Sequence, residues 1–291
     1  MSKAGRTGRQ SARARIAEQR AAARHRQVRN RILLTGGIIV LVVVVVVVFV
    51  VLSTGRKTPK ASSPTGTVLP ASVARQVTSV PASALNSVRS GSVRSFNPNP
   101  VKAISGPPLT SNGKPEMLYI GAEFCPYCAE LRWSMAVALS RFGSFTTPLR
   151  GIHSSPTDVY PNTATLTFYK ADYSSNYLAF TPVENETVNR APLQPTTKQQ
   201  QAIWDKYDPN SYPFIYFGGK YIITAPLYNP QVLQGKTWAE VAAALSDKST
   251  AIAQGADGAA NIMTAAICKV TGNQPSSVCS SPTITSLQGK L

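Results

Sequence analysis

The sequence EFCPYCAELRW, residues 123–133, places two cysteines three positions apart at a predicted strand-to-helix junction. The preceding run PEMLYIGAEF (115–124) is compact and apolar, which predicts a buried strand. From Pro126 onward apolar residues recur at helical spacing, at Leu131, Met135, Ala138, Leu139 and Phe142. We therefore expect a helix that begins at the cysteine pair and ends near Gly143.

Two cysteines at a helix start have a chemical purpose. Backbone N–H groups and the helix dipole favour negative charge there, so the pKa of Cys125 is expected to fall below the free value of about 8.5. Cys128 lies one turn later, within reach to form a disulfide with Cys125 and to resolve a mixed disulfide. Pro126 suits the first helical turn because it needs no N–H partner there. We predict that the Cys125 sulfur reaches solvent and that Cys128 stays shielded.

Two other roles are open for this pair, a permanent structural disulfide and a zinc site. A four-cysteine zinc site requires Cys268 and Cys279 to fold back onto Cys125 and Cys128. Ten residues that include the turn-forming GNQP separate Cys268 from Cys279. This spacing favours a local disulfide that closes the end of the chain, and nothing in it requires a relay of electrons to the first pair.

The net charge of +17 is unevenly distributed along the chain. Residues 1–31 carry ten Lys and Arg against the single acid Glu18, and residues 53–115 carry eight and no acid. From Glu116 to the C-terminus, twelve basic and twelve acidic residues balance. A nucleic-acid-binding domain needs its basic patch on a folded surface. We therefore predict no nucleic-acid partner.

The segment Ile32–Leu52 has twenty-one residues and no charge. A membrane-spanning helix needs about 20 apolar residues, whereas the apolar part of a signal peptide has about 7–15. We predict a retained single-pass anchor in contact with membrane lipid. The basic tail at 1–31 is expected to stay in the cytoplasm, and everything after Leu52 is expected to lie outside it.

Four parts follow from these patterns. They are a basic cytoplasmic tail (1–31), a transmembrane helix (32–52), a disordered stalk rich in Ser, Thr and Pro (53–80), and one extracytoplasmic domain (81–291). All four cysteines then lie where disulfides form and persist. His153 is the one histidine of this outer part, which argues against a His-rich metal site. No metal or other cofactor is predicted.

Within the domain we expect alternating strands and helices, and hence an α/β fold. Residues 101–105 are the predicted partner of the strand at 115–124. The other predicted elements are strands at 148–154 and 163–171, helices at 196–209, 237–245 and 258–270, and a hairpin at 212–223 around Gly218-Gly219.

The cysteine region resembles the thioredoxin-like superfamily. GAEFCPYC (121–128) is similar to its strand-end and active-site signature, and Cys-Pro-Tyr-Cys is the tetrad typical of glutaredoxins. SYPF (211–214) resembles the cis-proline turn that faces the disulfide in this fold. The resemblance implies that Tyr212 presents its backbone to a substrate chain. It implies catalytic roles for Cys125 and Cys128, and substrate-binding roles for Pro126, Tyr127, Tyr212 and Pro213.

A fuller resemblance covers most of residues 81–285. YIGAEFCPYCAELRWSMAVALSRFG, SSPTDVYPNTATLTFYKADYSSNYLAF and AAICKVTGNQPSSVC are similar to an uncharacterised family of membrane-anchored, thioredoxin-like prokaryotic proteins. It implies a fold and a location but no substrate. The 88 residues from Cys125 to Pro213 imply an insertion at about 155–210, as in the larger disulfide-forming oxidases of the cell envelope.

Two positions depart from the thioredoxin pattern. The buried acid that thioredoxins carry six residues before the first cysteine is Tyr119 here, and the Trp four residues before it is Gly121. Glu123 and Glu130 are nearby but are expected to face solvent. The pair therefore lacks the usual proton acceptor, which favours oxidase or isomerase work over reductase work.

Our first functional hypothesis is a membrane-tethered thiol–disulfide oxidoreductase. Cys125 forms a mixed disulfide with a protein substrate and Cys128 resolves it. Such an enzyme needs a redox partner, for which a membrane protein that handles quinones or reductant is a candidate. The second hypothesis is a non-catalytic scaffold module of the cell envelope with a permanent Cys125–Cys128 bridge. The third is a metal chaperone for a soft ion such as Cu(I), which no Met-rich loop supports.

Overall fold

The structure is a computed structural model that describes residues 66–291. Its main sheet is built around β4 (Lys114–Gly121), which is buried from Glu116 to its end. β4 pairs in parallel with β9 (Ala179–Glu184) and antiparallel with β10 (Phe214–Phe217). The sheet continues from β10 to β11 (Tyr221–Ile223) and β2 (Lys102–Ala103), and β3 (Thr110–Ser111) pairs with the start of β4.

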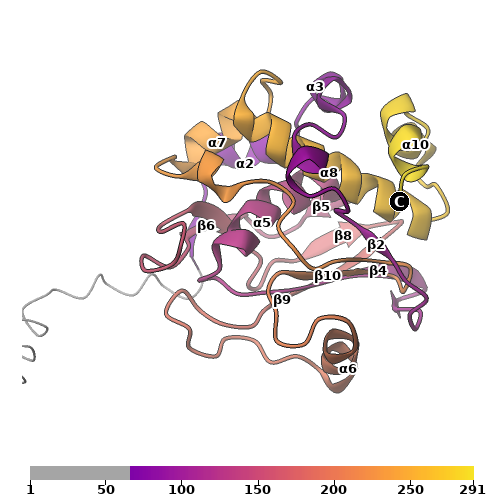
Figure 1. The fold of residues 1–291 in the computed structure, drawn as a ribbon, viewed down its shortest axis with the longest axis horizontal. Coiled ribbons are helices and arrows are strands. Elements are labelled where there is room, and N and C mark those ends of the chain that lie inside the picture. The colour runs from indigo at the N-terminus through magenta and orange to yellow at the C-terminus, as the bar shows by residue number, and fades with distance from the viewer. Residues whose placement is uncertain (1–65) are drawn as a thin grey trace, which may run out of the picture. The chain divides into compact units, whose positions relative to one another are not determined.

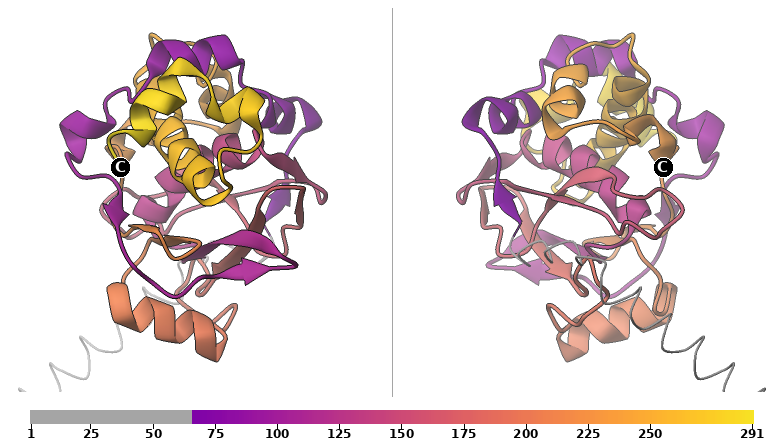
Figure 2. Two further views of the ribbon diagram at one scale, coloured as in Figure 1. Left: turned by 90° about the vertical axis from the view of Figure 1, so that its right-hand side faces the viewer. Right: turned by 90° about the vertical axis from the view of Figure 1, so that its left-hand side faces the viewer.

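Helices cover both faces of this sheet (Figures 1 and 2). α5 (Pro126–Leu139) and α8 (Ala251–Val270) pack against each other on one face, and α6 (Lys198–Tyr207) lies on the other. Shorter helices gather on the α5 and α8 side: α2 (Ala71–Thr78), α3 (Ala82–Val88), α4 (Val93–Phe96), α7 (Trp238–Ala244), α9 (Ser276–Cys279), α10 (Pro282–Gln288) and the 3-10 turn η1 (Pro230–Leu233).

Alternation along β4 separates the core into two layers. Successive side chains of a strand point to opposite faces of the sheet. Met117 and Tyr119 accordingly belong to the large core that includes α5 and α8. Leu118 and Ile120 belong to a smaller core that includes Trp204 of α6.

Two small sheets flank the main one. The first has the order β1 (Thr67–Val68), β6 (Arg150–His153) and β7 (Ala164–Thr167), and the second joins β5 (Gly143–Phe145) to β8 (Tyr173–Ser175). β7 also packs against α5, so this part of the chain supports the helix that carries the cysteines.

The predicted α/β fold is confirmed at the level of its elements. The strand expected at 115–124 is β4, and the helix expected after the first cysteine is α5. The expected hairpin is β10–β11, with Gly218 and Gly219 at positive φ in its turn. Glycine adopts such angles without the steric cost of a side chain, so the Gly-Gly pair made this turn predictable from the sequence.

The predicted partner of β4 is wrong. β2, within residues 101–105, pairs with β11, and the partner of β4 in that region is β3. Asn112 and Gly113 lie between β3 and β4, both at positive φ. An Asn-Gly pair of this kind closes a two-residue hairpin, and it therefore fixes β3 beside β4.

Two predicted boundaries also need correction. The described fold already begins at residue 66, because α2 buries Val73 and Val77 in the large core. The segment at 155–210 is not a simple insertion, because it contains β7 and β9, and β9 belongs to the main sheet. β9 was not predicted because it contains Pro182, and a proline argues against a strand. A proline is tolerated in β9 because this strand pairs with β4 alone and lies at an edge.

No helix within residues 66–291 is long and apolar enough to cross a membrane. The predicted tail at 1–31, the predicted span Ile32–Leu52 and the first part of the predicted stalk lie outside the described residues.

The predicted disulfide between Cys268 and Cys279 is confirmed. It joins the last turn of α8 to the end of α9 and closes a loop with a sequence separation of 11. Loop-closure entropy predicts that replacing both cysteines with Ser lowers the unfolding free energy by about 2–3 kcal/mol. Urea unfolding of the two proteins measures the difference, and equal midpoints at equal slopes would contradict it.

Candidate active site

The cysteine pair lies where β4 ends and α5 begins. Cys125 is the N-cap residue of α5, with φ −75° and ψ 121°, and its sulfur accepts a hydrogen bond from the backbone N–H of Cys128 at 3.3 Å. Pro126 occupies the first helical turn, where its missing N–H is harmless. The helix start therefore directs a hydrogen-bond donor at the Cys125 sulfur, as the spacing predicted.

The two sulfurs differ in burial and in acidity. Both cysteines are free thiols, and Cys125 keeps 5% of its surface exposed while Cys128 keeps none. The hydrogen bond from the Cys128 side chain lowers the pKa of Cys125, against the opposing effect of burial. Burial raises the pKa of Cys128 well above its usual range. Cys125 is therefore the more easily ionised thiol of the pair.

Cys128 is shielded as predicted, whereas Cys125 is less open than predicted. Phe124, Tyr127 and Tyr212 pack around the pair in one small apolar cluster. Packing against these rings leaves Cys125 only 5% exposed. The partly exposed rings of Tyr127 and Tyr212, together with Phe124, form an aromatic surface beside the cysteines.

Two of the four residues predicted to bind substrate, Tyr127 and Tyr212, lie at this surface. Tyr127 and Tyr212 are both partly exposed and belong to the cluster around the cysteines. The peptide bond between Tyr212 and Pro213 is cis. The ring of Tyr212 lies 6.0 Å from that of Phe124, centroid to centroid. The other two, Pro126 and Pro213, are buried. That these residues bind substrate stays a prediction.

Two loops contact the aromatic residues of the site. One is residues 154–163 between β6 and β7, and the other is residues 185–194 after β9. Arg190 of the second loop places its guanidinium 3.7 Å from the ring centroid of Phe124 and pairs with Asp158 of the first loop at 3.0 Å. The paired residues are 32 positions apart, and no local sequence pattern marks such a contact.

Glu123 and Glu130 are buried, contrary to the prediction. Glu123 accepts a hydrogen bond from the Thr167 hydroxyl at 2.8 Å, and Glu130 accepts one from the backbone N–H of Leu227 at 2.8 Å. Burial raises the pKa of Glu123 to about 7 and that of Glu130 well above its usual range. The prediction failed because the two partners lie 44 and 97 positions away in the chain.

A fully buried ion pair lies beneath the cysteines. Arg132 of α5 donates to both carboxylate oxygens of Glu184, at 2.8 and 2.6 Å, and also to the carbonyl of Ala122 at 2.8 Å. Its positive charge favours the thiolate form of Cys125 and of Cys128. Arg132 was not predicted to belong to the site. The available signal was a helix with apolar residues on every side, which must bury the charges that it carries.

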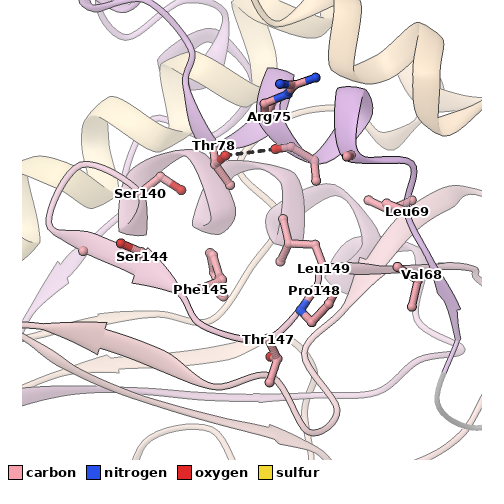
Figure 3. Close-up of a pocket in the computed structure, with 13 residues that line it drawn as sticks. Val68, Leu69, Arg75, Thr78, Ser140, Ser144, Phe145, Thr147, Pro148 and Leu149 are labelled. Atoms are coloured by element: carbon pink, nitrogen blue, oxygen red, sulfur yellow. Dashed lines mark hydrogen bonds between the residues drawn. The ribbon is translucent and has the colours of Figure 1, made fainter.

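A pocket of about 640 Å³ lies near the opposite end of α5 (Figure 3). Its walls come from α2, from β5 and from residues 147–149, with Ser140 just after α5. None of the predicted site residues lines it. The length of α5, about 20 Å at 1.5 Å per residue, separates it from the cysteines, so the pocket is not part of the candidate site.

Two metal sites were considered for these cysteines, a four-cysteine zinc site and a site for a single soft ion. Among residues 66–291, no group of three or more His, Cys, Asp or Glu side chains is placed to hold a metal ion. The four-cysteine zinc site is wrong, because Cys268 and Cys279 are joined to each other. Binding of a single soft ion by Cys125 and Cys128 stays a hypothesis.

The buried carboxyl groups predict a pH-dependent stability. The pKa of Glu123 is raised from 4.5 to about 7, and burial raises the pKa of Asp257 on α8 from 3.8 to about 8. The folded protein thus binds these protons more tightly than the unfolded chain does. Their stabilisation is complete below the unfolded pKa values and is lost as the pH rises through about 7 and about 8.

We therefore expect the unfolding free energy to fall by a few kcal/mol between about pH 5 and pH 9. Urea unfolding at a series of pH values measures this slope. Glu123→Gln is expected to flatten its lower part and Asp257→Asn its upper part. Slopes that stay unchanged in both variants would refute this linkage.

The model of one protein family, described as Domain of unknown function (DUF929), matches residues 100–269. The matched segment is more than half of the 291-residue chain and includes both Cys125 and Cys128. No curated protein and no solved structure matches the chain.

Proposed function

This chain belongs to the family described as Domain of unknown function (DUF929), and we propose that it is a thiol–disulfide oxidoreductase. The observation that carries this proposal is the contrast between its two cysteines. Cys125 caps a helix, has a lowered pKa and keeps some exposure, while Cys128 is fully buried one turn along. Disulfide exchange needs one accessible thiolate and one shielded neighbour that resolves the mixed disulfide.

We also propose that the fold is thioredoxin-like. The cysteine pair follows β4, and β10 begins directly after Pro213 and pairs with β4. Tyr212 is thereby held beside the cysteines. This relation between the active-site turn and the cis-proline turn is the one that the sequence resemblance implies.

In the proposed reaction a substrate thiolate attacks Cys125 of the Cys125–Cys128 disulfide. The bond between the two cysteines breaks, its electron pair stays on the Cys128 sulfur, and a mixed disulfide forms on Cys125. A second substrate thiolate then attacks the substrate sulfur of the mixed disulfide and expels Cys125 as a thiolate. The substrate gains a disulfide and the protein holds two thiols. The reverse sequence reduces a substrate.

The aromatic surface suits a protein substrate. Tyr127 and Tyr212 offer partly exposed rings beside Cys125, and such rings contribute large apolar contact areas. The backbone of Tyr212 is the candidate edge for β-type pairing with an extended substrate chain.

We propose a location outside the cytoplasm, at the membrane. The uncharged segment Ile32–Leu52 and the basic tail before it support this assignment. The disulfide between Cys268 and Cys279 also supports it, because such bonds persist in oxidising compartments. The dithiol form returns to the disulfide by exchange with a redox partner, for which a membrane protein that handles quinones or reductant is a candidate.

Oxidative refolding of a test protein examines the proposed activity. The full chain in detergent is added to reduced, unfolded ribonuclease A in a glutathione buffer, and regain of ribonuclease activity is followed. We expect acceleration by the wild type and by the Cys268→Ser/Cys279→Ser variant. We expect none from Cys125→Ser/Cys128→Ser. A wild type that gives no acceleration in oxidising or reducing buffers would favour the scaffold role instead.

A further inference from the structure

The two departures from the thioredoxin pattern form one structural unit. Tyr119 is fully buried in β4 and shares the sheet face of Gly121, two positions along. Its ring and hydroxyl lie over Gly121, so that a Cβ atom at this position would collide with both. Gly121 therefore leaves the space that the Tyr119 hydroxyl fills, directly below the turn to the cysteines.

The Tyr119 hydroxyl is a buried hydrogen-bond donor without an acceptor in the described part of the chain. It has no partner at ordinary hydrogen-bond distance among residues 66–291. The side chains that act on its pKa are Arg132, Cys128 and Glu184. Cys128 is the one among them that acts on the hydroxyl as a hydrogen-bonding group, although no hydrogen bond is formed between the two in this state. Burial keeps the pKa of Tyr119 well above 10, so the hydroxyl keeps its proton and can donate it in a hydrogen bond. An unpaired buried donor is unfavourable, which indicates that its partner arises in another state of the site.

The surroundings of Cys128 show which state this is. The groups that act on its sulfur are Cys125, the Arg132 guanidinium and the backbone N–H of Ala122, besides Tyr119. Arg132 also lies 5.9 Å from the centroid of the Tyr119 ring and has its Nη1 unpaired among the described residues. Hydrogen-bond donors and a cation thus act on the Cys128 sulfur. This environment suits a sulfur that gains negative charge.

We propose that Tyr119 donates a hydrogen bond to the Cys128 sulfur as that sulfur gains negative charge during exchange, an assignment that rests on the proposed function. When a substrate thiolate bonds to Cys125, the Cys125–Cys128 bond breaks and its electron pair stays on Cys128, where the hydroxyl stabilises it. In the reverse direction the same Cys128 thiolate attacks Cys125 and expels the substrate thiolate. In the first direction the hydrogen bond stabilises Cys128 as the leaving group. In the reverse direction it increases the ionised fraction of Cys128, and this gain exceeds the loss of nucleophilicity as long as the pH is below the raised pKa of Cys128. At the position where thioredoxins carry a buried acid, which accepts a proton, this chain therefore carries a hydrogen-bond donor.

A chromogenic aromatic disulfide, dithiobis(nitrobenzoate), separates the two steps. With the reduced full chain in detergent, attack by Cys125 releases one coloured thiolate at a rate that depends on reagent concentration. Attack by Cys128 on the resulting mixed disulfide releases a second at a rate independent of concentration. Tyr119→Phe is expected to slow the second phase about tenfold or more, as befits a hydrogen bond to a charged group, and to leave the first within about twofold. The apparent pKa of the second phase is expected to rise.

Tyr216→Phe is the matched control. Tyr216 is buried in β10 in the other core layer and donates to the carbonyl of Pro107, so neither phase is expected to change. Tyr119→Met, which also lacks the hydroxyl, replaces Tyr119→Phe if that variant does not fold. An unchanged second phase, or equal slowing of both phases, would overturn the role of Tyr119. A wild-type protein without any second phase would overturn the proposed function itself.

Discussion

Replacing Cys125 with Ser is expected to abolish thiol–disulfide exchange, whereas replacing Cys128 with Ser is expected to trap substrate. Cys125 supplies the attacking sulfur, and a hydroxyl at the same place is not ionised at neutral pH, so we expect at least about a 1,000-fold loss. In Cys128→Ser the Cys125 thiol, which keeps 5% of its surface exposed, remains, while the fully buried thiol that resolves the mixed disulfide is gone. Substrate should therefore accumulate on Cys125.

Acid quenching followed by non-reducing electrophoresis measures this trapping. A band of higher mass should appear with Cys128→Ser and vanish on reduction. The Cys125→Ser/Cys128→Ser double variant, in which only the disulfide-bonded Cys268 and Cys279 remain, serves as the control. If Cys125→Ser trapped substrate and Cys128→Ser did not, Cys128 would be the attacking cysteine, and the roles proposed for the two residues would be wrong.

Replacing Glu184 with Gln is expected to lower the unfolding free energy by about 3–5 kcal/mol. The pair of Arg132 and Glu184 has no exposed side-chain surface on either partner. Removing one charge of such a pair leaves the other buried without compensation. Asp158→Asn is the matched control, because Arg190, its partner, is 56% exposed. A solvent-exposed pair contributes less than about 1 kcal/mol.

Urea unfolding of the full chain in detergent, followed by tryptophan fluorescence, compares these variants. All three tryptophans of the chain, Trp133, Trp204 and Trp238, are within the described domain. Equal losses in Glu184→Gln and Asp158→Asn would show that the buried pair is not the stabilising contact that its geometry indicates.

The framework of the site could be predicted because its signals are local. An apolar run followed by residues at helical spacing marks β4 and α5, and Gly218-Gly219 marks the hairpin after Pro213. The short spacing between Cys268 and Cys279 marked their disulfide. Each of these features depends on residues that are close in the chain.

The surroundings of the cysteines could not be predicted because their contacts are distant in the chain. Arg132 and Glu184 are 52 positions apart, and each looks like a solvent-facing charge when its own segment is considered alone. Tyr119 and Gly121 were visible as departures from the thioredoxin pattern. Their relation appears only when the strand assigns both side-chain positions to one face. The strand β9 was missed because Pro182 interrupts its local pattern.

Cys125 and Cys128 are expected to exchange reversibly between dithiol and disulfide. The most direct measurement equilibrates the full chain in glutathione buffers of graded potential and quantifies alkylation of Cys125 after acid quenching. We predict a reversible two-electron midpoint between about −270 and −120 mV, the range of thiol–disulfide oxidoreductases. A pair that stays oxidised below about −300 mV behaves as a structural bridge, and that result would contradict reversible exchange.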